Sequence, residues 1–148
     1  IIIRPHPKLL NKEIKILDIL RNKNFFVDLK SDRKIGEIYK VSDLIICDYG
    51  GTIFSALYLE KPILLLNIDK NTEFYNQQQK NLSLDIFLRN EIINLDLNQK
   101  DKLKLFFSKA LEREYINKIK SLKKKYFGEK KDYLSKEDTV KLILNYLK

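Results

Sequence analysis

The stretch from Leu44 to Asn67, LIICDYGGTIFSALYLEKPILLLN, constrains the fold more than any other part of the sequence. Two apolar runs of strand-forming residues flank a segment of helical character, and a pair of glycines marks the start of that segment. Strands that are joined by a helical crossover pair in parallel. The stretch therefore predicts a β-α-β unit, with a helix over residues 52–60 between strands that begin at Leu44 and Pro62.

The rest of the chain extends this alternation of strands and helices. Further strands are expected at residues 1–3, in the run from Asn24 and at residues 92–95, and further helices at 8–22, 35–41, 82–88, 99–111, 115–126 and 135–147. The run from Leu44 is apolar enough to be buried on both faces of a sheet. We expect an α/β fold, a doubly wound parallel sheet of the Rossmann-like type with helices at its C-terminal end.

Length and residue usage limit the organisation of the chain. Its 148 residues suit a single domain covering 1–148, and the absence of Met together with a strand at residue 1 predicts a C-terminal fragment of a larger protein. The single cysteine, Cys47, excludes an internal disulfide and fits a reducing, cytoplasmic compartment. No apolar run approaches the ~20 residues that span a bilayer, and no Cys/His cluster has metal-ligand spacing.

The net charge of +9 favours anionic partners. Most of the excess is lysine distributed over helices, and the densest segment, residues 118–131, lies in the C-terminal third. Because such lysines usually form a solvated helix face, nucleic acid is not an expected partner. An anionic membrane surface fits the same charge.

A glycine turn follows the strand that starts at Leu44. Parallel α/β sheets bind ligands beyond the carboxyl ends of their strands, and Gly50 and Gly51 lie at such an end, where they let the backbone approach a ligand closely. The following helix start and the hydroxyls of Thr52 and Ser55 add hydrogen-bond donors. These four residues predict a phosphate-binding turn. The alternative is a tight turn in which Thr52 caps the helix; no complete G-x-G-x-x-G or Walker motif is present.

Other strand ends carry polar side chains that would meet at the same edge of the sheet. His6 and Asp48 are the predicted catalytic residues: His6 would act as a general acid or base, and Asp48 would orient it or bind a substrate hydroxyl. Arg4 is predicted to bind phosphate, and Asn67 and Asp69 to bind substrate hydroxyls. The structural alternatives are a structural histidine, a helix cap for Asp48, a salt bridge for Arg4 and an Asx turn for Asn67 and Asp69.

The combination of RPHP with SDLIICDYGGTIFSALYLEKPILLL, ending in Asn67 and Asp69, resembles a known family. It is similar to the C-terminal half of the CDP-glycerol glycerophosphotransferase, or teichoic acid polymerase, family and of related GT-B glycosyltransferases. Those enzymes carry a His-Pro pair after a strand, an aspartate-led DYSS-type turn before a helix, and a Lys-Pro pair that opens the next strand. The tail from Lys123 resembles the closing helix of the family. Gly50 and Gly51 replace the paired serines of the turn.

The resemblance implies the donor-binding domain of a transferase. Such an enzyme would move a glycerophosphate, polyol-phosphate or sugar group from a nucleotide-activated donor, CDP-glycerol or a nucleotide sugar, to a cell-surface polymer of the teichoic acid or capsule polysaccharide kind. His6 and the amides and hydroxyls of Gly50, Gly51, Thr52 and Ser55 would hold the donor's phosphates, without a metal or other cofactor.

The resemblance also implies an N-terminal domain that completes the active site. The basic helices would place the whole protein on the inner face of the cell membrane, and the fragment alone would be inactive. The alternative function is a non-catalytic phosphate-binding or regulatory α/β module, which the loss of the paired serines favours.

Overall fold

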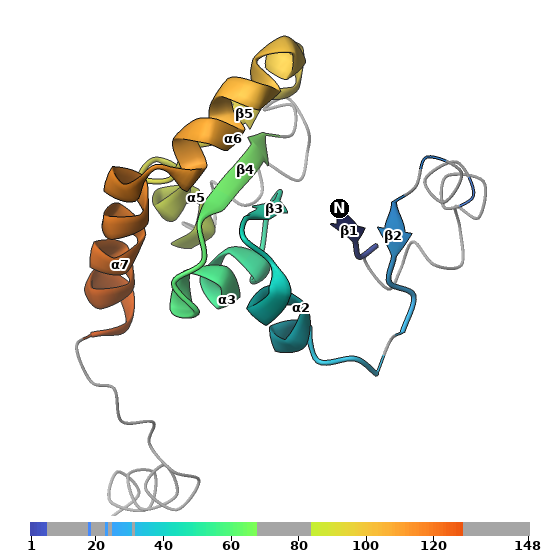
Figure 1. Ribbon diagram of the computed structural model, residues 1–148. Helices are drawn as coiled ribbons and strands as arrows, with labels where there is room; N and C mark the ends of the chain where they lie inside the picture. The colour runs from blue at the N-terminus through green and yellow to red at the C-terminus, as the bar shows by residue number, and fades with distance from the viewer. Residues whose placement is uncertain (6–17, 19–22, 24, 31, 68–83, 129–148) are drawn as a thin grey trace, which may run out of the picture. The chain divides into compact units, whose positions relative to one another are not determined.

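A computed structural model describes residues 1–5, 18, 23, 25–30, 32–67 and 84–128 (Figure 1). The chain forms two compact units, Ile1–Ile38 and Tyr39–Lys148, and each is described by itself. The expected helices at 8–22 and 135–147 lie outside the described residues. That the chain forms a single domain stays a prediction.

The first unit contains a two-stranded parallel sheet. Strand β1 (Ile2–Ile3) pairs with β2 (Phe26–Val27), so that Ile2 faces Phe26 and Ile3 faces Val27. Backbone hydrogen bonds extend the pairing at both ends, from Phe26 N to Ile1 O at 3.1 Å and from Asp28 N to Ile3 O at 2.9 Å. The strands predicted at residues 1–3 and after Asn24 are therefore confirmed.

Helix α2 (Ile35–Val41) is the short helix that the apolar spacing predicts. Lys61, from the Lys-Pro pair that opens the later strand, binds the carboxyl end of this helix. Its Nζ donates to the carbonyl oxygens of Lys40 at 3.3 Å and Ser42 at 2.9 Å. An ammonium group is favourable there because the last carbonyls of a helix lack partners within the helix.

The second unit is built on a three-stranded parallel sheet with the order β3-β4-β5 (Figure 1). The strands are β3 (Ile45–Cys47), β4 (Ile63–Asn67) and β5 (Asn94–Asp96). Helix α3 (Thr52–Tyr58) joins β3 to β4, and α5 (Leu84–Arg89) precedes β5. The predicted β-α-β unit is confirmed. Parallel strands in two small sheets, together with several helices, are consistent with a Rossmann-like α/β fold.

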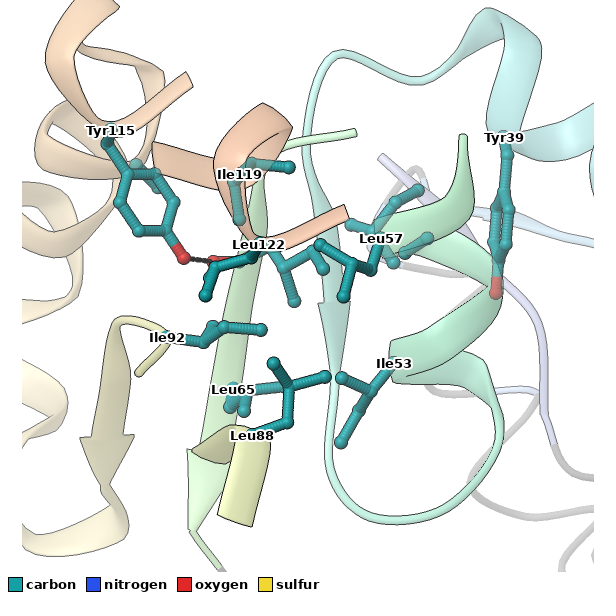
Figure 2. Close-up of a cluster of buried hydrophobic side chains, with 13 residues drawn as sticks. Tyr39, Ile53, Leu57, Leu65, Leu88, Ile92, Tyr115, Ile119 and Leu122 are labelled. Carbon is teal, nitrogen blue, oxygen red and sulfur yellow. Dashed lines mark hydrogen bonds between the residues drawn. The ribbon is translucent and has the colours of Figure 1, made fainter. Parts of the chain in front are cut away.

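The central strand, β4, is buried on both faces. Ile63 and Leu65 belong to the main hydrophobic core, while Leu64, which points to the opposite face, is also fully buried. Figure 2 shows Leu65 gathered with Ile53 of α3 and Leu88 of α5. Among the described strands of this sheet β3 is an outer one, and Ile46 is 42% exposed. The expectation that the run from Leu44 is buried on both faces is therefore wrong for Ile46, whereas Ile45 of the same strand is buried.

The C-terminal part of the unit packs onto this core. It comprises a 3-10 helix, η2 (Leu97–Lys102), and helices α6 (Leu103–Leu111) and α7 (Arg113–Phe127), close to the predicted bounds. Tyr115, Ile119 and Leu122 of α7 are buried at helical spacing. The Tyr115 hydroxyl donates to Ile63 O at 2.7 Å (Figure 2). It also accepts from Ile93 N at 3.1 Å. Helix α7 therefore bridges β4 and the segment that enters β5.

Candidate functional site

The turn after β3 has a backbone shape that requires glycine. Gly50 has φ +94°, in the left-handed region that side chains with a Cβ rarely adopt. Gly51 is right-handed helical, with φ −63° and ψ −18°, and is the N-cap of α3. Thr52 is thus the first residue of the helix, and no side chain caps it. The alternatives in which Thr52 or Asp48 caps this helix are therefore wrong.

Substitution of the two glycines by alanine should separate backbone strain from contact. A Cβ at either position meets no heavy atom within 4 Å, so only the backbone conformation differs. We expect Gly50→Ala to lower the free energy of unfolding by about 1–2 kcal/mol. Gly51→Ala should leave it unchanged or raise it slightly. Urea denaturation measures both, and equal effects would contradict the assigned conformations.

The N–H of Gly50 is held by a carboxylate from another element. Asp85, in the first turn of α5, accepts this hydrogen bond through Oδ2 at 3.0 Å. The Asp85 residue is only 4% exposed. A buried carboxylate needs such donors to offset the loss of hydration. The contact fixes the glycine turn to α5.

Arg89, four residues further along α5, binds the ends of two strands. Its Nη2 donates to Asp48 O, and its Nη1 donates to Leu66 O at 3.3 Å and to Asn67 Oδ1 at 2.6 Å. The guanidinium lies over the ring of Tyr49, with Cζ 3.9 Å from the ring centroid. The residue is 6% exposed. Arg89 therefore ties the turn after β3 to the carboxyl end of β4.

The electrostatics of this cluster follow from its burial. Burial lowers the pKa of Arg89, and the neighbouring Tyr49, Cys47, Asp85 and Asp48 oppose that shift. An arginine keeps its charge through such a shift. Burial, followed by the charge of Asp48, raises the pKa of the Cys47 thiol from 9.0 to about 12. The thiol at the end of β3 is therefore protonated at neutral pH.

The shifted thiol gives a pH-dependent prediction. Only thiolate is alkylated, so at pH 8 iodoacetamide should modify folded chain about a hundredfold or more slowly than chain unfolded in urea. Cys47 is the single cysteine, so the total rate reports it alone. Because the unfolded chain loses this proton near 9.0 and the folded chain near 12, the free energy of unfolding should also fall as pH rises across that interval. Similar rates in both states would contradict the assignment.

Asn67, at the end of β4, connects the three strand ends. Besides accepting from Arg89, it donates through Nδ2 to Asn94 Oδ1 at 2.8 Å and to Asp96 Oδ1 at 2.7 Å. Both amide protons of Asn67 are thus used within the fold. Within the described part of the chain, Arg89 uses one lone pair of Asn67 Oδ1, and the contact of Asn67 with a substrate hydroxyl stays a prediction.

The other predicted site residues are placed as follows. Arg4 makes the salt bridge that was its structural alternative, with Nη1 3.2 Å from Asp28 Oδ2, and its Nη2 donates to Arg33 O at 2.8 Å. Ser55 donates to Gly51 O at 3.3 Å. The side chain of Asp48 is exposed. His6 and Asp69 lie outside the described residues. The phosphate, hydroxyl and catalytic roles of these residues stay predictions.

Sequence reasoning missed Asp85 and Arg89. Their spacing of four residues on a short helix, in LDIFLR, indicates that they share one helix face, and this was the available signal. Within the described ranges, no group of three or more His, Cys, Asp or Glu side chains could hold a metal ion. No helix in the same ranges is both long enough and apolar enough to cross a membrane.

Comparison with known families bears on this arrangement. The sequence profile of the CDP-glycerol:poly(glycerophosphate) glycerophosphotransferase family matches residues 1–145. The chain belongs to this family. Comparison with curated proteins and with solved structures gave no significant match. The resemblance seen in RPHP and in the DYGG turn is thus confirmed over nearly the whole length of the chain.

Membership in the glycerophosphotransferase family gives the strand-end cluster a chemical context. The family uses a nucleotide-activated donor, CDP-glycerol, which carries two linked phosphates. In this member the glycine turn, the end of β4 and the end of β5 are joined by Arg89 and Asn67. The carboxyl ends of parallel strands are where α/β folds place their ligands.

Proposed function

We propose that this chain is the donor-binding part of a glycerophosphotransferase and that the turn from Asp48 to Thr52 holds the donor's phosphates. The family match over residues 1–145 carries the proposal. The left-handed Gly50 supports it, because a turn of this shape lets backbone amides approach an anion closely.

The donors that we assign to phosphate come mainly from the backbone. The N–H of Gly50 already donates to Asp85. We therefore assign the amides of Gly51 and Thr52 to the ligand. The hydroxyl of Thr52 adds a donor to them, and that of Ser55 adds one when its single proton turns from Gly51 O to the phosphate. Helix α3 has seven residues, so its dipole contributes less than these individual groups.

The proposed reaction is the transfer of a glycerophosphate group. An acceptor hydroxyl oxygen bonds to the phosphorus that carries glycerol, and the bond from that phosphorus to the bridging oxygen breaks, so that cytidine monophosphate leaves. The amides of the turn stabilise the negative charge that develops on the leaving phosphate. His6 is proposed to donate to this phosphate, or to move the proton of the acceptor hydroxyl.

The wider setting completes the proposal. The chain would be the C-terminal half of a GT-B enzyme, with an N-terminal domain that supplies the acceptor site. The acceptor would be a cell-surface polymer, and the lysines of α7 would attract the anionic inner surface of the membrane. Polyol-phosphate or sugar nucleotides are the other donors that this site would accept.

Calorimetric titration tests the proposed function. The chain is titrated with CDP-glycerol, CDP, CMP, UDP and a UDP-sugar, and the titration is repeated with Thr52→Val, Ser55→Ala and His6→Ala. Ser108→Ala is the matched control for Ser55, because both hydroxyls donate to the carbonyl four residues earlier. We expect the cytidine ligands to bind, each site variant to weaken binding, and the control to leave it unchanged.

The contrary outcomes are equally distinct. Absence of binding at millimolar CDP-glycerol would overturn the donor-binding role. Binding of inorganic phosphate that equals the binding of CDP-glycerol would favour the alternative function, a phosphate-binding module without transferase activity.

A further inference from the structure

We infer that Asp85 and Arg89 are positioning residues that hold the turn from Asp48 to Gly51 in its donor-binding shape. The inference rests on the proposed function, because it concerns the ligand of that turn. It adds a role for α5 that the sequence motif does not contain.

Two side chains of α5 form hydrogen bonds with the backbone of the turn, at two different positions. Asp85 accepts from the N–H of Gly50, and Arg89 donates to the carbonyl oxygen of Asp48, two residues earlier. The two side chains are four residues apart on the helix and therefore share one face. Arg89 also donates to Leu66 O, which links the same helix to β4. The turn is thus held between a helix and the central strand.

The buried charges and the left-handed glycine of this arrangement cost more free energy than a stable fold needs. The Nε of Arg89 is buried without a hydrogen-bond partner among the described residues. Gly50 has a left-handed backbone, and both Asp85 and Arg89 are charged groups removed from water. Apolar residues of similar size often pack such positions with equal or greater stability. Unsatisfied donors and unusual backbone conformations together are typical of functional sites.

The sign of the Asp85 charge separates a positioning role from direct binding. A carboxylate next to a phosphate site repels the ligand, so its own charge cannot favour donor binding. Its contribution must come from holding the turn, through the Gly50 hydrogen bond and through its charge beside Arg89. Asparagine at this position keeps an acceptor oxygen and removes the charge, whereas alanine removes both. Asp85→Ala should therefore weaken donor binding, whereas Asp85→Asn should leave it unchanged or strengthen it.

The test combines amide hydrogen exchange by NMR with calorimetric titration of CDP-glycerol. The proteins are the wild-type chain, Asp85→Asn, Asp85→Ala and Arg89→Lys, with the exposed Asp101→Ala as control. We expect Asp85→Ala to speed exchange at Gly50 and to weaken CDP-glycerol binding by about tenfold, because a preorganised turn is lost. Asp85→Asn should keep protection at Gly50 and bind as tightly as wild type or more tightly. Arg89→Lys keeps the charge but loses the forked contacts, so it should also bind more weakly.

Each contrary result has its own meaning. A wild-type chain that does not bind CDP-glycerol overturns the proposed function and this inference with it. If wild type binds and Asp85→Ala binds equally well, only the inference is overturned. Should Asp85→Ala fail to fold, Asp85→Asn decides the matter: weaker binding with Gly50 still protected overturns the positioning role.

Discussion

Arg89→Met is expected to lower the free energy of unfolding by about 3–5 kcal/mol, because removing one member of a buried charged cluster leaves the other members without partners. Three acceptors lose their donor in this variant: Asp48 O, Leu66 O and Asn67 Oδ1. The carboxylate of Asp85 also loses the positive charge that faces it from the same helix. Methionine has similar length and is apolar, so the packing volume is nearly kept.

Urea denaturation followed by circular dichroism measures this effect. Arg113→Met is the matched control, since Arg113 is exposed at the start of α7 and should give no measurable change. The double variant Asp85→Leu/Arg89→Met should recover part of the loss, because both buried charges are then gone. A loss below about 1 kcal/mol in Arg89→Met would contradict the network of contacts described for this residue.

The strands and helices were predictable because their patterns are local. The run from Pro62 to Asn67 has the continuous apolar character of a buried parallel strand, and it forms β4. The spacing of Tyr115, Ile119 and Leu122 follows one helix face, and these residues pack in the core. Among the described residues, the errors concern details such as the exposure of Ile46 and the N-cap of α3.

The candidate site was only partly predictable because its contacts are remote in sequence and involve the backbone. Gly50 and Gly51 were predicted from their place after a strand, and Asn67 from the end of the next one, and all three lie at the strand-end cluster. The partners of Arg89 include the carbonyl oxygens of Asp48 and Leu66, which any residue type would supply, so no sequence pattern marks them. Asp28, the partner of Arg4 in the salt bridge, is 24 positions away, so no local sequence pattern identifies it either.

The glycines of the turn and the charged pair of α5 form one argument about the site. In the proposed function, backbone amides of the glycine turn are the main donors to the ligand's phosphates. An amide is useful only when the backbone is held in one conformation, and glycine is the least restrained residue. Asp85 and Arg89 supply that restraint from outside the turn. The core beneath α5 should therefore influence the site as well as the stability.

Leu88→Ala tests this link between the core and the site. Leu88 lies between Asp85 and Arg89 in sequence, is fully buried, and packs in the cluster with Ile53 and Leu65 (Figure 2). We expect the substitution to lower the free energy of unfolding by about 2–5 kcal/mol through lost apolar contact and the cavity it leaves. Because the same helix carries the charged pair, amide exchange at Gly50 should also become faster under native conditions.

Leu84→Ala is the matched control for Leu88→Ala. It removes the same atoms from the same helix, but Leu84 is 62% exposed and loses little contact. Its free energy of unfolding and its exchange at Gly50 should both stay close to wild type. If Leu88→Ala destabilised the chain while exchange at Gly50 stayed unchanged, the packing of α5 would contribute to stability without affecting the conformation of the turn. If both changed together, the packing of one leucine would set the geometry of the amides that we assign to the donor's phosphates.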